Sequence, residues 1–114
     1  SNKILIHYDT NVGGDEITFV RIVRGSTAIG VGDATGQRIA VTQGGAFRAS
    51  NNDKVTVFSG SFLDSPNTTS ETTYKLQLYL ISGTAAKVNA PRNDTNAGYT
   101  GRSISTITVM EVAA

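Results

Sequence analysis

Apolar and polar residues alternate along most of this chain, and this period of two constrains the fold more than any other feature. The pattern is clear in "KILIHY" (residues 3–8), "ITFVRIVR" (17–24) and "KVTVFSGSFL" (54–63). Successive side chains of a β-strand point to opposite faces, so alternation of this kind indicates strands with one buried face. No stretch shows convincing helical periodicity. The sequence therefore predicts an all-β fold.

Eight runs of this character are separated by turn residues. We expect strands at residues 3–8, 17–24, 27–31, 38–42, 54–63, 72–81, 84–88 and 103–112. Frequent turns between about eight short strands favour an antiparallel jelly-roll sandwich. A length of 114 residues fits a single domain, residues 1–114.

Glycine and proline add local detail. Ser82-Gly83 lies between two of the runs and predicts a tight hairpin that joins 72–81 to 84–88. Gly13-Gly14 and Gly44-Gly45 are interpreted as turns. Gly60 predicts a bulge or bend in its strand, which Pro66 then ends because proline cannot donate to a ladder.

Charge and composition narrow the classes of partner. Ten basic residues nearly match nine acidic ones without forming a cluster, so we expect no nucleic-acid binding. No apolar stretch approaches the roughly 18 residues of a membrane-spanning helix, so we expect no membrane insertion. The chain has no cysteine, which excludes disulfides and thiolate chemistry.

Two of the expected strands are apolar on both faces. In residues 72–81, one side carries Tyr74, Leu76, Leu78 and Leu80, and the other carries Tyr79 and Ile81. In residues 103–112, one side carries Ile104, Met110 and Val112, and the other carries Ile107 and Val109. One face of each strand fills the sandwich, and the second needs a neighbouring subunit, loops or a further segment to cover it. We expect self-association, with the subunit interface at Tyr79, Ile81, Ile107 and Val109.

Three segments carry a family resemblance: "RGSTAIGVGDA" (24–34), "FLDSPNTTSETTYKLQ" (62–77) and "STITVMEVAA" (105–114). Together they resemble the C-terminal jelly-roll domain of marine and cyanobacterial phage tail-fibre and related virion structural proteins. The likeness extends in weaker form from about Lys3 to the end of the chain. That domain is similar in architecture to the trimeric jelly rolls of the tumour-necrosis-factor and complement-globular type.

The resemblance implies a homotrimer located in the virion, at the tip of a tail fibre or spike or projecting from the capsid. Its partners would be its own copies, other virion proteins and host surface carbohydrate. Members of the family usually carry a further strand region before the segment equivalent to "SNKILI" (residues 1–6). We expect either a longer parent protein or another chain that supplies this strand by β-augmentation.

Catalytic chemistry has little support in the sequence. His7 alternates with Leu5 and Asp9, and a Ser-His-Asp arrangement stays open because such triads are recognised by geometry. No nucleophile-elbow or HExxH motif accompanies it. Asp64, before Ser65-Pro66, is expected to cap a turn. We predict no enzyme activity and no catalytic residue, with a small glycan-cleaving enzyme as the remote alternative.

Metal and cofactor sites are likewise not predicted. A cation such as Ca²⁺ needs six or more oxygen ligands. Asp9, Asp15 and Glu16, or the loop with Asn93, Asp94 and Asn96, could supply a few of them, but without EF-hand spacing. We expect no metal and no cofactor.

Arg21 and Arg24 interrupt an otherwise apolar strand. A buried arginine would need a partner, for which Asp64 or Glu111 could serve across strands or subunits. We expect Arg24 to point to solvent, with its stem covering apolar surface. For Arg21 both placements stay open.

The polar segment 89–101, "NAPRNDTNAGYTG", is long for a hairpin loop. Asn and Asp hydrogen bonds beside an aromatic platform are typical of surfaces that bind carbohydrate, and loops on rigid scaffolds often carry function. The predicted glycan- or receptor-binding residues are Arg92, Asn93, Asp94, Asn96 and Tyr99. The alternative is a solvated connection across one end of the sandwich, in a purely structural trimerisation or capsid-decoration module.

Overall fold

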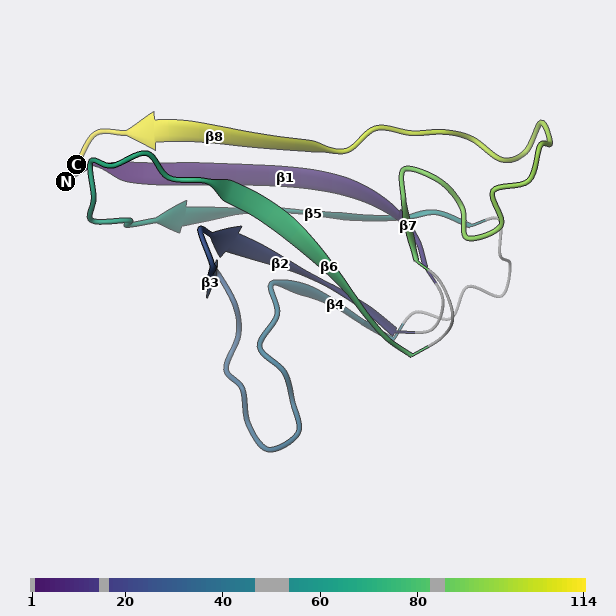
Figure 1. Ribbon diagram of the computed structural model, residues 1–114, viewed down its shortest axis with the longest axis horizontal. Helices are drawn as coiled ribbons and strands as arrows, with labels where there is room; N and C mark the ends of the chain where they lie inside the picture. The colour runs from purple at the N-terminus through teal and green to yellow at the C-terminus, as the bar shows by residue number, and fades with distance from the viewer. Residues whose placement is uncertain (1, 15–16, 47–53, 83–85) are drawn as a thin grey trace.

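A computed structural model of the chain (Figure 1) describes residues 2–14, 17–46, 54–82 and 86–114. These residues form strands and no helix, which confirms the all-β prediction. The strands are β1 (Lys3–Gly13), β2 (Ile17–Arg24), β3 (Thr27–Ile29), β4 (Gln43–Ala46), β5 (Thr56–Asp64), β6 (Tyr74–Ser82), β7 (Lys87–Val88) and β8 (Thr106–Val112).

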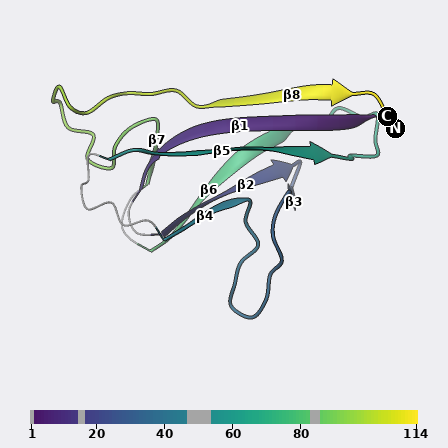
Figure 2. The ribbon, with the colours of Figure 1, turned by 180° about the vertical axis from the view of Figure 1, so that it is seen from behind.

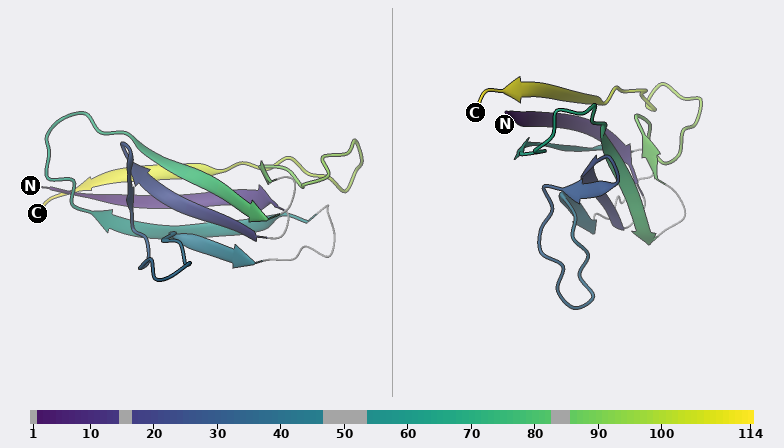
Figure 3. Two further views of the ribbon diagram at one scale, coloured as in Figure 1. Left: turned by 60° about the horizontal axis from the view of Figure 1, so that its bottom comes forward. Right: turned by 60° about the vertical axis from the view of Figure 1, so that its left-hand side comes forward.

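The strands make two antiparallel sheets, each built around one central strand. In the β1 sheet, β1 lies between β5 on one side and β8 and β7 on the other, as Figure 2 shows for β8, β1 and β5. In the β2 sheet, β2 lies between β6 on one side and β3 and β4 on the other. The two sheets face each other in a sandwich-like arrangement (Figure 3).

The core lies between the two central strands and follows from their alternation. Its buried residues are Ile6, Tyr8 and Val12 of β1, Val20 and Ile22 of β2, Ile29 of β3 and Phe58 of β5. Full burial of an aliphatic side chain of this size contributes roughly 1.5–3 kcal/mol. Tyr74, Leu76 and Leu78 of β6 are partly buried against this core, as the alternation of residues 72–81 predicts.

Gly60 was predicted to form a bulge or a bend, and the structure shows that it is not a bulge. It pairs with Tyr8 in an unbroken register between β1 and β5. A Cβ at Gly60 would lie 3.0 Å from the Tyr8 hydroxyl oxygen, and that hydroxyl donates a 2.6 Å hydrogen bond to Gln43 Oε1. Glycine is therefore present because the Tyr8 ring occupies the space above it.

The predicted strand at residues 38–42 is also wrong. The strand in this region is β4, which pairs with β2 and contains Gly44-Gly45, so these glycines are not a turn. Gly44 has φ 120°, and a Cβ there would lie 2.4 Å from the carbonyl oxygen of Thr18. Only glycine lets the chain approach β2 this closely at this position of the Gln43–Ala46 pairing.

The hairpin predicted between 72–81 and 84–88 does not form. β6 pairs with β2, whereas β7 pairs with Val12 and Gly13 at the end of β1 in the other sheet. Gly83 and Thr84 lie outside the described residues. The long-range burial of β6 side chains against the core outweighs the local turn preference.

Residues 30–42, which we call the arm, project from the β2 sheet on the side of β3 and β4 (Figures 1 and 3). The amide of Gly32 donates to the carbonyl of Val41 (3.1 Å), and that of Arg38 donates to Thr35 (3.0 Å). Thr42 fixes the base: its amide donates to Val20 (3.0 Å) and its hydroxyl accepts from the Ile22 amide (3.0 Å). Residues 32–39 are exposed.

We predict that Gly13→Ala destabilises the fold. Gly13 is buried under residues 89–91, and a Cβ there would lie 2.2 Å from the Ala90 carbonyl oxygen and 2.6 Å from Pro91 Cα. Because these are backbone atoms, β1 or the crossing segment must shift, at a cost of about 1–3 kcal/mol. Urea unfolding of the variant and the wild type measures this loss in the free energy of unfolding. Gly32→Ala, where no atom lies within 4 Å of the added Cβ, is the matched control, and equal stabilities of the two variants would contradict the prediction.

Candidate functional site

The loop that joins β7 to β8 contains every predicted binding residue, and an ion pair closes it. Arg102 donates from Nε to Asp94 Oδ1 (2.9 Å) and from Nη2 to Oδ2 (2.6 Å). Two parallel bonds of this kind fix the geometry of both side chains. Asp94 therefore holds the loop together, although such an exposed pair adds at most about 1 kcal/mol to stability.

Thr100 organises the turn beyond this ion pair. Its hydroxyl lies in hydrogen-bond contact with the carbonyls of Thr95 and Ala97, and its amide also donates to Ala97 (3.1 Å). Tyr99 projects from this turn with 70% of its surface exposed. Asn93 and Asn96 are exposed as well, whereas Arg92 is partly buried.

Asn11, Asn89 and Ser105 attach the loop to β1, and sequence reasoning did not find them. The Ser105 hydroxyl hydrogen-bonds Asn89 Oδ1 and accepts from the Asn11 amide (3.1 Å). Asn11 Nδ2 donates to the carbonyl of Ile104 (2.7 Å), and the Asn89 amide donates to Asn11 (2.8 Å). Asn89 has φ 67°, a left-handed conformation that asparagine tolerates better than most residues. The loop between β7 and β8 is thus attached to β1, the central strand of its sheet.

The second notable surface is an opening between β8 and β6, which we call the seam. Ile107 and Val109 pair with Tyr8 and Ile6, so their side chains share the core face of the β1 sheet, yet they are 42% and 51% exposed. Two hollows, of about 660 and 200 Å³, lie along the opening. The apolar residues that line the seam include Ile4, Leu76, Leu78, Val88, Ile107 and Val109.

Tyr79 and Ile81, the other two predicted interface residues, lie on the outer face of β6. Both are about half exposed. Beside Tyr79 is a hollow of about 490 Å³ whose apolar lining includes Phe19, Ile39 and Val41. The four predicted interface residues therefore fall on two different surfaces, one on each side of the β2 sheet.

A third apolar row crosses the outer face of the β1 sheet and was not predicted. Leu5 of β1 pairs directly with Leu63 of β5 and with Met110 of β8. Leu63 and Met110 are both about half exposed. Alternation within one strand cannot reveal such a row, because it depends on the register between three strands.

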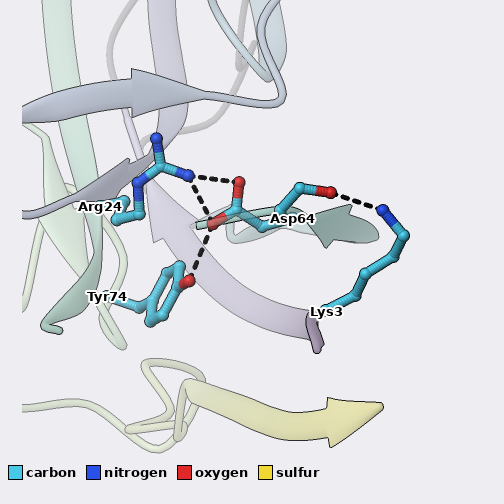
Figure 4. Close-up of polar contacts among 5 residues, drawn as sticks. Lys3, Arg24, Asp64 and Tyr74 are labelled. Carbon is cyan, nitrogen blue, oxygen red and sulfur yellow. Dashed lines mark hydrogen bonds and ion pairs between the residues drawn. The ribbon is translucent and has the colours of Figure 1, made fainter. Parts of the chain in front are cut away.

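Asp64 binds Arg24 and Tyr74 where the two sheets meet (Figure 4). Arg24 Nη1 donates to both carboxylate oxygens (2.6 and 2.7 Å), and the Tyr74 hydroxyl donates to Oδ2 (2.8 Å). Asp64 is only 4% exposed. The expectations that Arg24 points to solvent and that Asp64 caps a turn are therefore wrong. Because the Asp64 carboxylate is buried at the end of β5, it needs a compensating cation, and Arg24 of the facing sheet provides it.

The same cluster shifts two pKa values. Burial, followed by the hydrogen bond to Asp64, raises the pKa of Tyr74 to about 12. The hydrogen bond to Asp64 raises the pKa of Arg24.

Arg21, by contrast, is exposed and donates from Nε to Gln77 Oε1 (2.7 Å), which resolves its open placement in favour of solvent.

The residues considered for catalysis or metal binding do not converge on a site within the described ranges. His7 pairs with Ser61 and Thr108 on the solvent-facing side of the β1 sheet, with Asp9 two residues farther along β1. Asp15 and Glu16 lie outside the described residues. In the described part of the chain, no group of three or more His, Asp or Glu residues is placed to hold a metal ion. No helix there is long and apolar enough to cross a bilayer.

Comparisons with protein-family models, with curated proteins and with solved structures find no match to this chain. The resemblance to phage fibre domains therefore stays a prediction.

We predict that the protein loses stability above pH 10 in part through Tyr74. Its pKa is about 12 in the folded chain against an ordinary 10.0, so the folded state favours the neutral phenol. The resulting stabilisation is complete below pH 10 and is lost as the pH rises toward 12. Urea unfolding between pH 8 and 12 measures the loss.

Tyr74→Phe should show a smaller decline over the same pH range. Tyr8, whose pKa burial also raises, retains its own contribution in that variant. Identical pH profiles of the two proteins would contradict the assignment.

Proposed function

We propose that this domain is an assembly and host-recognition module of a bacteriophage virion. In this proposal it is a homotrimeric jelly roll at the tip of a tail fibre or spike, or on a capsid projection. Self-assembly rests on the half-exposed Ile107 and Val109, which lie on the core side of their sheet. The phage context rests on the resemblance of the segments 24–34, 62–77 and 105–114.

The size of the exposed surface supports assembly. The chain exposes 7081 Å², whereas a compact monomer of 12.0 kDa exposes about 6,000 Å². The excess is comparable to the roughly 800 Å² that each partner contributes to a standard interface. The radius of gyration, 15.7 Å, also exceeds the roughly 13 Å of a compact domain of this length.

The positions of the apolar surfaces favour a ring over a two-fold dimer. A two-fold contact uses the same patch on both copies, whereas a ring joins two different patches on neighbouring copies. Here the seam and the outer face of β6 with Tyr79 and Ile81 are distinct surfaces of one chain. A trimer is the closed ring that the family resemblance implies.

The proposed recognition site is the tip of the loop between β7 and β8. Tyr99 offers an exposed ring, Asn93 and Asn96 offer exposed amides, and the Asp94–Arg102 pair fixes the loop around them. Preformed geometry of this kind lowers the entropic cost of binding a hydroxyl-rich ligand. In the structural alternative, the same assembly forms and this loop has no ligand.

We predict that the purified chain has a mass near three times 12.0 kDa by light scattering at micromolar concentration. Ile107→Lys and Tyr79→Lys should each yield monomers, because burying an unpaired ammonium group in an interface is costly. Ile104→Lys is the control, since Ile104 is 76% exposed and lies outside both sheets. A monomeric wild-type chain would overturn the assembly proposal.

We predict that the chain binds host surface polysaccharide on a glycan array. Tyr99→Ala and Asn93→Ala should each weaken binding about tenfold or more, equivalent to about 1.4 kcal/mol. Thr35→Ala, an exposed change in the arm, should bind as the wild type does. Binding that is unaffected by both loop changes would refute the site, and the absence of any glycan ligand would favour the purely structural module.

A further inference from the structure

The arm contains a segment with the sequence of a strand but no place in a sheet. Residues 37–41, "QRIAV", alternate Ile39 and Val41 with Arg38 and Ala40, and this pattern predicts a strand. The structure leaves these residues outside both sheets, with Ile39 exposed. Within the described ranges, their backbone hydrogen bonds run only to residues of the arm itself.

β8 presents the complementary feature, a sheet edge without a neighbour. Among the described strands it pairs with β1 alone, so its other edge carries unpaired N–H and C=O groups. Natural edge strands are commonly blunted by lysine, proline or a bulge. In β8, "TITVMEV", the only charged residue is Glu111. This edge is suited to accept a further strand.

A strand added to β8 would also fill the seam. Alternate side chains of the added strand would point to the core side of the β1 sheet. There Ile107 lines one hollow with Leu76 and Leu78 of β6, and Val109 lines the other with Tyr74. Glu111 is the one charged residue that lines the two hollows of the seam. If Ile39 of an added strand points into the seam, Gln37 and Val41 share its face, whereas Arg38 points to the outer face of the β1 sheet.

The arm and the seam lie on opposite sides of the β2 sheet. The arm leaves from the side of β3 and β4, whereas the seam opens along β6, with β2 between them. A contact between the arm of one copy and the seam of the next therefore joins two different surfaces. Repetition of such a contact gives a ring when the rotation between copies closes, as in a trimer, and an open filament when it does not.

We propose that the arm of one copy adds as a strand to the β8 edge of a neighbouring copy and inserts Ile39 into its seam. This inference rests on the proposed self-assembly and names the segment that completes each subunit. Residues 37–41 then pair with the partner's β8, and the free backbone groups of that edge are satisfied.

Disulfide trapping tests the contact directly, because the natural chain has no cysteine. Chains with Ile39→Cys and with Val109→Cys, carrying tags of different size, are co-expressed and then oxidised. A disulfide forms only when the two Cβ atoms approach within about 4.5 Å, so a mixed dimer on a non-reducing gel reports the contact. The control pairs Ile39→Cys with Val57→Cys, an exposed position on β5.

We expect the Ile39–Val109 pair to cross-link at least tenfold more than the control pair. Ile39→Lys should also reduce the trimer to a monomer, with its far-UV circular dichroism unchanged because the side chain is already exposed, while Ile104→Lys stays trimeric. Cross-linking no greater than that of the control, or a trimer that survives Ile39→Lys, would overturn the arm contact and leave self-assembly standing. A monomeric wild-type chain would overturn both.

Discussion

The ion pair between Asp64 and Arg24 is the constraint on which the relative position of the two sheets depends. A carboxylate that is 4% exposed is tolerated only when a cation and hydrogen-bond donors compensate for its lost hydration. Asp64 belongs to the β1 sheet, and both of its partners, Arg24 and Tyr74, belong to the β2 sheet. The end of β5 is therefore fixed against the end of β2 and the start of β6. Tyr74 also lines the larger hollow of the seam, so the same cluster borders that end of the opening.

The alternation of side chains allowed much of the fold to be predicted, because burial on one face is a local property of each strand. It identified β2 with its observed bounds, and it identified the two apolar faces of β6 from Leu76, Leu78, Tyr79 and Ile81. It could not identify strand partners. Whether residues 38–42 join a sheet depends on which strand edge lies beside them. In the structure the strand that pairs with β2 here is β4, where Gly44 lies against the Thr18 carbonyl.

Residues that act through distant partners were the other failure of prediction. Arg24 and Asp64 are 40 positions apart, and a strand pattern shows no reason for either to be buried. The candidate binding residues fared better, since a long polar loop with one tyrosine is visible in the sequence itself. Even there, the sequence does not show which loop residues are structural and which are exposed. Asp94 closes the loop through Arg102, while Tyr99 and Asn93 face solvent.

The loop between β7 and β8 is held in place by contacts within one chain, whereas the seam has apolar walls that one chain does not cover. Hydrogen bonds from Thr100, Asn11 and Ser105 hold the loop, so its shape is determined inside the subunit. The seam has apolar walls and an unpaired edge, so its final shape depends on what covers it. In the proposed assembly, receptor contact and subunit contact are therefore energetically separate, and changes in one surface leave the other intact.

The amide of Ala114 donates to the Asn2 side chain (3.3 Å), so the two ends of the described chain meet at one end of a body 49 Å long. The loop with Tyr99 lies at the opposite end (Figure 1). Domains whose ends are adjacent are tolerated as insertions into the surface loops of unrelated hosts, because they enter and leave at one point. Grafted by these two ends onto another scaffold, the described chain holds the loop with Tyr99 outward, where new loop sequences can be selected.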